Sequence, residues 1–411
     1  MKEWKKVKLG EVAEIIDGDR GKNYPKNNDF FKQEYCLFLN TGNVTTNGFA
    51  FEDNQFITKE KDDILRKGKL KREDLVLTTR GTVGNIAYYN NRVAFENVRI
   101  NSGMVILRVN MHMALPSFLY LLLRSNEGRT YLKSFCTGSA QPQLPIKNLS
   151  QISYSLPPLP TQHRIASILS RYDALIENYQ KQIKLLEEAA ARLYKQWFVE
   201  LKFPGYQNTT IVDGVPEGWE KKKIGEVCNT IGGGTPSTKV ASYYEGGKIN
   251  WVTPTDITRN KCLCLLDTEK KITDEGLKNS SAKMLPAGTI LMTSRASVGY
   301  FGICDFEVCT NQGFISCIPF EKYHQMYLLF NLMNRVDEIR IKAGGSTYLE
   351  ISKSVFRNFD IICPTYSIAN LFQANVEKII ENVKNLSLQI RHLTESRDRL
   401  LPKLMSGELE V

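Results

Sequence analysis

The sequence predicts an α+β protein in which two globular domains form a tandem repeat. Each domain is followed by a long helix, and we expect the two helices to form an antiparallel intramolecular coiled coil. Three observations lead to this fold class: an internal repeat, two heptad patterns, and mixed strand and helix patterns between them. The 411 residues are 42% hydrophobic and 24% charged. That composition is typical of globular proteins and excludes disordered and fibrous classes.

The internal repeat relates the two halves of the chain. The segment 4–12 returns 215 residues later as 219–227, and the segment 77–84 returns at the same distance as 292–299. The offset then falls to 210 for Asn101-Ser102-Gly103 and Asn311-Gln312-Gly313, and to 207 after that. Loops tolerate deletions and packed elements do not, so shorter loops in one copy explain the drift. We interpret the chain as two copies of one unit.

Each copy ends in a heptad pattern in which apolar residues recur at alternating spacings of four and three. Such a pattern keeps one seam facing one partner helix, which favours a coiled coil over a surface helix. The first helix is expected within 158–205 and the second within 367–411, each about 55 Å long at ~1.5 Å per residue. The expected seam consists of Ile165, Leu169, Tyr172, Ile176, Tyr179, Ile183, Leu186, Leu193, Trp197, Val376, Ile379, Val383, Leu386, Ile390, Leu393, Leu400 and Leu404.

The globular domains are expected over 1–157 and 206–366. Short apolar runs predict buried strands, and longer patterns predict a helix in each domain. The expected strands include 76–77, 105–107, 289–292 and 314–318, and the expected helices cover 116–133 and 321–342.

A chain of this order has one compact solution, in which the two helices pair antiparallel within the chain. The two domains then acquire a pseudo-two-fold axis, as in an isologous dimer. DNA-binding dimers use such symmetry to place two readers on one duplex, and a helix of fixed length would set their spacing. The competing solution pairs the helices between chains and gives an oligomer.

The charge balance favours a polyanionic partner. The chain has 54 Lys and Arg against 44 Asp and Glu, a formal net charge of +10. The first domain carries 23 − 16 = +7 and the second 18 − 17 = +1. In a cytoplasmic protein the commonest polyanion is nucleic acid.

Catalytic and metal-binding motifs are not found in the sequence. There is no phosphate-binding GxxxxGK[ST] loop, and the four histidines have no metal-ligand spacing. The nine cysteines contain no CxxC pair, and no apolar stretch reaches the ~20 residues of a membrane helix. We therefore expect a cytoplasmic, non-catalytic binding protein with free thiols, no metal and no membrane association.

Several segments resemble the specificity subunit of type I restriction-modification systems. The segments 219–227, 233–237 and 249–257 look like one of its target recognition domains, and 19–25 with 77–85 resemble another subtype. The segments 156–166 and 195–200 are similar to the start and end of the family's central conserved helix. The second junction, 364–370, lacks a glutamine equivalent to Gln162.

The resemblance implies a DNA-reading subunit without catalysis of its own. Each recognition domain would read one half of a bipartite double-stranded DNA target. The paired helices would set the spacing and dock two methyltransferase subunits, which use S-adenosylmethionine. Restriction subunits would add ATP- and Mg-dependent translocation and cleavage. The rival hypothesis is a structural or adaptor protein whose two domains bind proteins.

Sequence-specific contacts are expected where the two copies diverge. The divergent loops offer Arg or Lys for guanine, Asn for adenine, and Ser or Thr for phosphate, although charged loops are often merely solvated. Arg80 and Arg295 occupy the same place in both copies, and each would contact a phosphate or pair with a carboxylate inside its domain. The other candidate DNA-binding residues are Arg20, Lys22, Tyr24, Lys26, Asn27, Thr235, Ser237, Thr238, Lys239, Thr253, Thr255 and Arg259.

The surface of the helices is the expected partner face. Phe198 adjoins Trp197 near the end of the first heptad pattern and exceeds what a two-stranded seam requires. Aromatic side chains outside a core often mark interfaces, so Phe198 is expected to be exposed for a partner.

Overall fold

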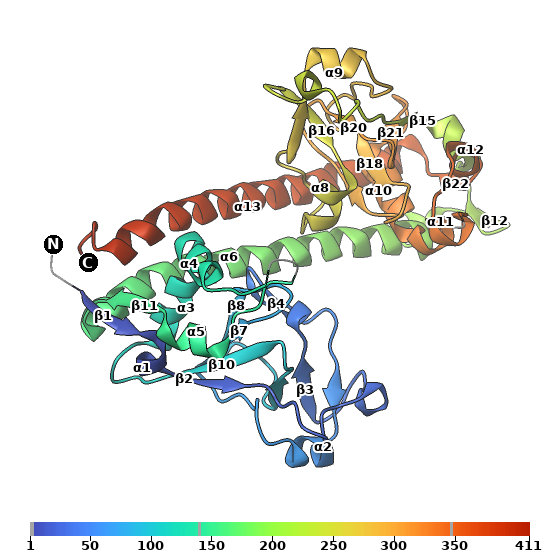
Figure 1. Cartoon of the computed structure of the whole chain (residues 1–411). Coiled ribbons are helices and arrows are strands. Elements are labelled where there is room, and N and C mark those ends of the chain that lie inside the picture. The colour runs from blue at the N-terminus through green and yellow to red at the C-terminus, as the bar shows by residue number, and fades with distance from the viewer. Residues whose placement is uncertain (1–3, 139–140, 346–347) are drawn as a thin grey trace. The chain divides into compact units, whose positions relative to one another are not determined.

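The computed structural model describes residues 4–138, 141–345 and 348–411. The chain divides into two compact units (Figure 1). Unit 1 comprises residues 1–174 and 393–411, and unit 2 comprises residues 175–392. Each unit therefore contains one globular domain and a part of both long helices.

Unit 1 contains two main sheets. An antiparallel sheet has the strand order β2-β10-β7-β8, and a smaller sheet has the order β6-β3-β9, in which β9 runs parallel to β3. Two further pairs are β1–β11 and β4–β5. The strands are β1 (Lys5–Lys8), β2 (Ala13–Asp17), β3 (Cys36–Leu39), β4 (Val44–Thr45), β5 (Gly48–Phe49), β6 (Phe56–Ile57), β7 (Asp74–Thr78), β8 (Ile86–Tyr89), β9 (Val98–Ile100), β10 (Met104–Val109) and β11 (Ser153–Leu156).

Unit 2 repeats the two main sheets and the β1–β11 pair of unit 1, whereas the pairs β4–β5 of unit 1 and β12–β13 of unit 2 have no counterpart in the described residues of the other unit. Its sheets have the orders β15-β21-β18-β19 and β17-β16-β20, with β20 parallel to β16, and β14 pairs with β22. The strands are β12 (Ile211–Val212), β13 (Val215–Pro216), β14 (Glu220–Lys223), β15 (Cys228–Gly232), β16 (Ile249–Val252), β17 (Lys270–Ile272), β18 (Ile290–Thr293), β19 (Phe301–Gly302), β20 (Cys309–Thr310), β21 (Phe314–Pro319) and β22 (Asp360–Cys363). The tandem repeat and the α+β class are confirmed.

The central strands are apolar because the main sheet is covered on both faces. In unit 1, Leu75 and Leu77 point to a core shared with the helices, whereas Val76 points to a second core against β3 and β9. In unit 2, Ile290 and Met292 belong to the helix-side core and Leu291 to the other. Successive residues of a strand face opposite sides, so one apolar run supplies both cores.

The helix expected over 116–133 is two helices, α3 (Pro116–Arg124) and α4 (Asn126–Ser134). The Ser125 hydroxyl accepts the Gly128 N–H at 2.8 Å and starts α4 with a side-chain cap. The helix expected over 321–342 is likewise α10 (Gln325–Asn334) and α11 (Val336–Lys342). The remaining short helices are α1 (Leu9–Val12), η1 (Asn27–Asp29), η2 (Thr41–Asn43), α2 (Lys59–Ile64), α5 (Ile146–Gln151), η4 (Tyr206–Asn208), α7 (Ile224–Val227), η5 (Ala241–Tyr243), α8 (Pro254–Arg259), α9 (Asp274–Lys278) and α12 (Lys353–Arg357).

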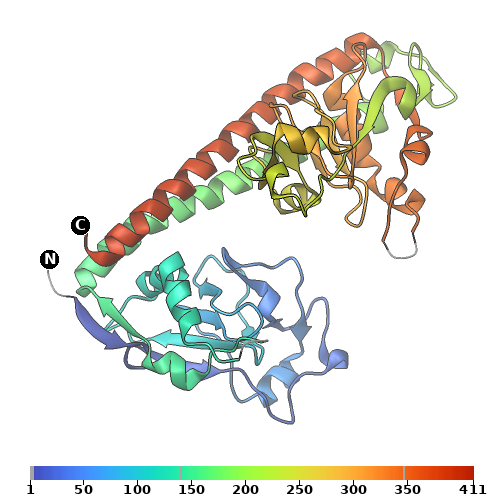
Figure 2. The same ribbon diagram turned by 45° about the horizontal axis from the view of Figure 1, so that its top comes forward.

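The two heptad patterns form α6 (Leu159–Tyr194) and α13 (Tyr366–Ser406). Unit 1 combines the first part of α6 with the last part of α13, and unit 2 combines the last part of α6 with the first part of α13. The helices therefore pair antiparallel within the chain, as predicted (Figures 1 and 2). A π-helical turn, η3 (Lys195–Val199), follows α6, and both lie within the 158–205 in which the first helix was expected.

The expected seam positions lie between the helices to different depths. Eight are buried, namely Ile165, Leu169, Ile176, Ile183, Trp197, Val376, Val383 and Leu404. The others, Tyr172, Tyr179, Leu186, Leu193, Ile379, Leu386, Ile390, Leu393 and Leu400, are half-buried. Full burial concentrates where a domain packs onto the helices, because a two-stranded seam alone leaves one edge open to solvent.

Arg397 interrupts the apolar seam in unit 1. Its guanidinium donates to the Asp173 carboxylate at 2.6 Å, and Arg124 of α3 donates to the same carboxylate at 3.0 Å. The three side chains are only 13%, 24% and 14% exposed, respectively. Asp173 therefore joins α13, α6 and the domain at one point.

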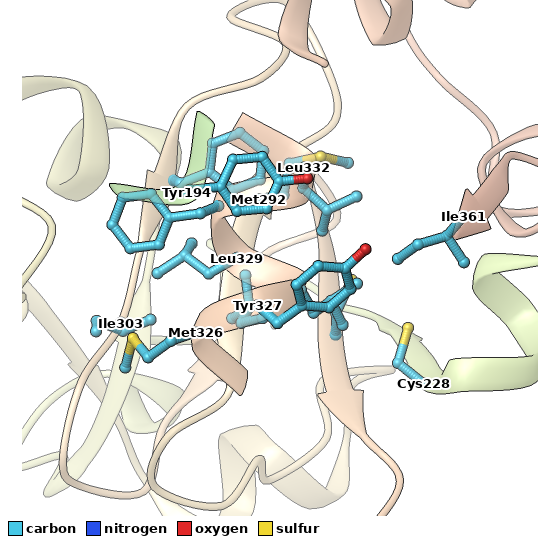
Figure 3. Close-up of a cluster of buried hydrophobic side chains, with 14 of the residues drawn as sticks. Tyr194, Cys228, Met292, Ile303, Met326, Tyr327, Leu329, Leu332 and Ile361 are labelled. Carbon is cyan, nitrogen blue, oxygen red and sulfur yellow. The ribbon is translucent and has the colours of Figure 1, made fainter. Parts of the chain in front are cut away.

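Phe198 is not the exposed partner residue that the sequence suggested. Its ring lies 4.7 Å from that of Tyr327 and 5.0 Å from that of Phe372, centroid to centroid. It packs against the large core of unit 2, where Tyr194 and Tyr327 lie (Figure 3). The prediction was wrong because the heptad count took no account of α10 as a third packing partner.

The two domain-to-helix junctions are alike despite the missing glutamine. In unit 1, Gln162 Oε1 accepts the Leu115 N–H at 2.9 Å at the start of α3. In unit 2, Gln373 Oε1 accepts the Met326 N–H at 2.8 Å at the start of α10. Gln373 lies one helical turn beyond the position that the 207-residue offset would give, so the sequence comparison missed it.

Replacing Asp173 by Ala tests the link between α13 and the rest of unit 1. We expect the amides of 393–406 to lose about 1–3 kcal/mol of opening free energy in hydrogen exchange, because two mostly buried guanidinium groups lose the carboxylate that they share and Arg397 keeps only the more exposed Asp398 as an acidic partner. The amides of 366–392, in unit 2, should keep their protection.

The matched control is Glu188→Ala, which removes an exposed partner of Lys184 at 3.9 Å. Such a surface pair contributes under about 1 kcal/mol. Unchanged protection of 393–406 in the Asp173 variant would show that the ion pair does not hold α13.

Candidate nucleic-acid interface

A turn between two strands organises the candidate site of unit 1. Asn101, Ser102 and Gly103 link β9 to β10, and the Asn101 Oδ1 accepts the Gly103 N–H at 2.9 Å. The Gly103 carbonyl accepts the N–H groups of Thr79 and Arg80 at 2.9 and 3.2 Å. The loop that carries Arg80 is thus fastened to this turn.

The Arg20 loop meets the same turn from the other side. A Cβ at Gly18 would clash with the Asn101 carbonyl, so only glycine allows this approach. The Arg20 guanidinium donates to the Ser102 carbonyl at 3.3 Å and to Asp17 Oδ1 at 3.1 Å. Its side chain remains 48% exposed, which leaves further N–H donors free to contact a ligand.

Asp19 holds the Arg20 loop in shape. Its carboxylate accepts the N–H groups of Gly21 and Arg66, both at 2.7 Å, and is almost completely buried. The Gly21 N–H is the main cause that lowers the Asp19 pKa below its ordinary value; burial opposes it, and the Arg66 N–H adds to it. The loop is therefore fixed before any ligand binds.

A buried ion pair fixes the neighbouring loop. Arg99 in β9 pairs with Asp62, and its guanidinium also donates to the carbonyls of Lys67 and Leu65 at 2.8 and 3.1 Å. Burial raises the Asp62 pKa, but hydrogen bonds from Lys69 and Arg99 outweigh it and leave that pKa lowered. The segment that supports Asp19 is thus held from inside the domain.

The remaining candidates of unit 1 fall into two groups. Lys22, Lys26 and Asn27 are exposed, whereas the Tyr24 ring packs edge-on against Phe38 at 5.8 Å. Tyr24 belongs to a small core under the loop, so we do not retain it as a DNA contact.

Unit 2 builds the same frame from different residues. Asn311, Gln312 and Gly313 link β20 to β21, and Asn311 Oδ1 accepts the Gly313 N–H at 2.9 Å. The Gly313 carbonyl accepts the Ser294 N–H at 2.7 Å, one residue before Arg295. Gly233 approaches the Asn311 carbonyl as Gly18 approaches that of Asn101.

Thr235 occupies the position of Arg20, 215 residues later. Its hydroxyl donates to Gln312 Oε1, and both side chains are exposed. Ser237, Thr238 and Lys239 follow on the same loop and are also exposed.

The other candidates of unit 2 lie on α8. Thr253 caps this helix, and its hydroxyl and N–H both bond to Asp256 Oδ2 at 2.7 Å. Because both groups are used in the cap, we do not retain Thr253 as a DNA contact. Thr255 is half-buried, and Arg259 is 77% exposed with Glu269 at 3.9 Å.

Arg80 and Arg295 sit on equivalent loops but have different neighbours. Both are exposed, and each is bridged by its backbone to a hairpin residue, Gln143 for Arg80 and Glu350 for Arg295. The Arg295 Nε lies 3.6 Å from the Glu350 carboxylate. The two arginines thus differ in the neighbour that could compete with a phosphate. Arg295 has the acidic Glu350 beside it, whereas Arg80 has the neutral Gln143.

The conformation of these loops is also repeated. The residue after the arginine is left-handed in both copies, with φ of 70° at Gly81 and 58° at Ala296. Alanine rarely adopts this region, which costs about 1 kcal/mol or more, and such strain often marks a functional loop.

Sequence reasoning missed η2 of unit 1, the counterpart of the predicted α8 segment, and the tip of the turn. Thr41 of η2 in unit 1 and Pro254 of α8 in unit 2 pack against the glycines that end the two turns. A repeated capping pair at an offset of 213 residues, Asn40 with Asn43 and Thr253 with Asp256, was the available signal. Ser102 and Gln312 themselves were matched as repeats but not considered as contacts.

No group of three or more His, Cys, Asp or Glu side chains that could hold a metal ion occurs among the described residues. All nine cysteines, each within the described ranges, are free thiols. Over the same ranges, no helix is both long and apolar enough to cross a membrane.

A family model described as the type I restriction modification DNA specificity domain matches residues 1–188 and 216–395. The matches cover most of the chain, once per repeat. The chain therefore belongs to this family, and it is a specificity subunit with two tandem recognition domains.

Individual relatives agree with this family. The chain is 25% identical over 473 residues to the type I restriction enzyme HindI specificity subunit of Haemophilus influenzae, covering 100% of both chains. It is 29% identical over 354 residues to the MjaIX specificity subunit of Methanocaldococcus jannaschii, covering 82% of this chain and 78% of that one. The crystal structure of an S subunit from M. genitalium shares the fold, with a TM-score of 0.56, 15% identity, and coverage of 98% and 96%.

The Asp19 carboxylate predicts a pH dependence of the Arg20 loop. Its pKa is lowered in the folded chain, so its stabilisation is fully present above the ordinary carboxyl pKa of about 3.9 and is lost as the pH falls through the lower folded value. We expect the Gly21 and Arg66 amides to lose hydrogen-exchange protection, relative to the intrinsic rate, as the pH falls from 5 to about 3.

Asp19→Asn should remove that pH dependence and leave both amides less protected at pH 7. Asp17→Asn is the control, because the Asp17 carboxylate accepts its bond in this loop from the half-exposed Arg20 side chain and not from the amides that are measured. Equal pH profiles for wild type and Asp19→Asn would contradict the assignment.

Proposed function

We propose that this chain reads a bipartite double-stranded DNA target, with one recognition domain for each half. The observation that carries the proposal is the repeated frame around the Asn-x-Gly turns. In both units this frame brings together an exposed arginine loop, a helix start, and a loop with divergent polar side chains. A constant frame with variable donors fits recognition of two different half-sites.

The retained candidates divide by chemistry into base readers and phosphate anchors. Arg20, Lys22, Lys26 and Asn27 would read the first half-site. Ser237, Thr238 and Lys239, which follow Thr235 on the same loop, would read the second together with Thr255 and Arg259. Arg80 and Arg295 would contact the DNA backbone in either domain, because both copies place them alike whatever the sequence read.

The paired helices would set the distance between the half-sites and dock two methyltransferase subunits. The 41 residues of α13 make a helix of about 60 Å, a length that does not vary. Away from the seam, the helices of unit 2 expose the apolar side chains of Leu185 and Leu371, at 64% and 43%. Exposed apolar side chains on a polar helix surface favour a protein partner.

In this proposal the chain has no catalytic step of its own. Its part is to bind and orient DNA, and the partner subunits supply the chemistry. The methyltransferase subunits would use S-adenosylmethionine, and the restriction subunits would use ATP and Mg. The chain's own basic and polar loops would hold the target in register for both.

Methylation mapping tests the proposal. Cells that carry this chain with type I modification subunits should gain one split motif, two defined halves around a fixed spacer, that is absent without the chain. Arg20→Ala should relax one half and leave the other unchanged, since Arg20 belongs to unit 1 alone.

An assembled complex that adds no methylation would refute the DNA-reading role. The salt dependence of binding distinguishes the DNA-reading role from the adaptor hypothesis, because phosphate contacts release counterions and protein contacts mostly do not. DNA affinity should therefore fall steeply between 50 and 200 mM salt, by a factor on the order of 10³ or more for six phosphate contacts.

The neutral and acidic neighbours of the two arginines give a reciprocal prediction. Glu350→Gln copies Gln143 and frees Arg295, so DNA affinity should rise about two- to five-fold, in line with an exposed ion pair. The slope of log affinity against log salt should steepen by about one. Binding titrations of the complex at several salt concentrations measure both.

The matched control is Gln143→Glu, which places a carboxylate beside Arg80 and should lower affinity to a similar extent. The double variant should return close to wild type. If both single variants bind as wild type does, the two arginines do not contact phosphates.

A further inference from the structure

The tips of the two Asn-x-Gly turns are the point where the frames of the units differ most in chemistry. In both turns the Gly N–H donates to the Asn Oδ1, and a glycine, Gly18 or Gly233, closely approaches the Asn carbonyl. The middle residue is Ser102 in unit 1 and Gln312 in unit 2. A scaffold that is constant around one variable, exposed polar side chain is what a base-reading position requires.

We infer that Gln312 reads an adenine in the second half-site and that Thr235 is its positioning residue. This inference rests on the proposed function and assigns to it a residue and a base. It also extends the site beyond the divergent loops, because Gln312 lies on the turn that joins β20 to β21.

The hydrogen-bonding groups of Gln312 match adenine in the major groove. The Thr235 hydroxyl donates to one lone pair of Gln312 Oε1, which leaves the second lone pair and both amide N–H donors free. Adenine presents the N6 donor and the N7 acceptor, which one amide group satisfies together. Guanine presents two acceptors, N7 and O6, so the amide oxygen would face an acceptor.

The bond from Thr235 prepares the amide for this contact. A free glutamine has several rotamers and loses this freedom when it binds, whereas a fixed amide has less to lose. Thr235 itself is held close to the turn, because the Gly234 N–H donates to the Thr310 carbonyl at 2.8 Å. The reader and its positioning residue are therefore fixed to the same turn.

Neighbouring groups place Gln312 among the elements that would meet DNA. The Gly313 carbonyl fastens Ser294 and hence the loop of Arg295, the proposed phosphate anchor. Pro254 Cγ lies 3.1 Å from the point that a Cβ would occupy at Gly313, so the start of α8 packs against the same turn. A phosphate contact from Arg295 would set the register in which the amide meets one base edge.

Unit 1 has a different reading side chain at the equivalent place. Ser102 has only a short hydroxyl, and its carbonyl accepts from Arg20, which occupies the position of Thr235. The reader at this place is then a guanidinium, which suits the two acceptors of guanine. The same frame can thus hold an amide reader or a guanidinium reader. The reader is the turn residue where that side chain is the longer one, as in Gln312, and the loop residue where that one is longer, as in Arg20.

Selection from a duplex pool with randomised half-sites tests the inference on the full chain with its modification subunits. In Gln312→Ala, one A·T pair of the second half-site should lose about ten- to one-hundred-fold of its discrimination, while the first half-site stays unchanged. Gln312→Glu should shift the preference at that pair toward cytosine, which offers the N4 donor.

Thr235 is tested by a pair of variants. Thr235→Val keeps the shape of the side chain but removes its hydroxyl donor, so discrimination at the same base pair should fall. Thr235→Ser keeps the hydroxyl, so discrimination should stay close to wild type. A side chain with only a structural role would weaken all positions of the half-site together. Gln312→Ser, which copies unit 1, keeps the turn and repeats the test if the alanine variant does not fold.

The outcomes separate this inference from the function on which it rests. A wild-type complex that selects no split target refutes the proposed function. A wild-type split target whose second half is unaffected by every Gln312 variant refutes only the role of Gln312. Uniform weakening across the half-site would make Gln312 a backbone contact and would equally overturn the inference.

Discussion

The antiparallel seam between α6 and α13 is the constraint on which the rest of the fold depends. The core of unit 1 contains Leu169 from α6 and Leu404 from α13, and the core of unit 2 contains Ile183 and Phe372. Neither repeat therefore completes a hydrophobic core with its own helix alone. Because burial of apolar surface dominates folding, each domain needs a helix segment from the other repeat.

Within each unit, close backbone approach places the functional loops. Gly18 and Gly233 stand at equivalent positions, and in both a Cβ would clash with the carbonyl of the turn asparagine. The contacts that define the frame are backbone hydrogen bonds and the bond from the turn glycine N–H to the asparagine Oδ1, none of which uses the side chains that point outward. The exposed residues are thus free to differ while the frame stays the same. This separation allows two half-sites to be read by one fold.

Electrostatics distinguishes the two domains more than topology does. The first domain has a net charge of +7 and the second +1, and the acidic Glu350 lies beside Arg295 where Gln143 lies beside Arg80. Domain 1 is therefore suited to long-range attraction of DNA, while domain 2 depends more on short-range polar groups such as Thr235 and Gln312. Ion pairs such as Arg99 with Asp62 serve inside the domain, where they order loops before binding.

The sequence by itself determined the repeat, the two long helices and the central strands, because these depend on local periodicity and on apolar runs. It did not reveal that Arg20 meets Ser102, that Thr235 meets Gln312, or that Gln373 replaces Gln162 from the next helical turn. Those contacts join residues far apart in the chain, and several use backbone carbonyls that carry no sequence signature. It also misjudged Phe198, since aromatic burial depends on which elements pack nearby. Only the tertiary structure decided the site, because long-range packing brings its parts together.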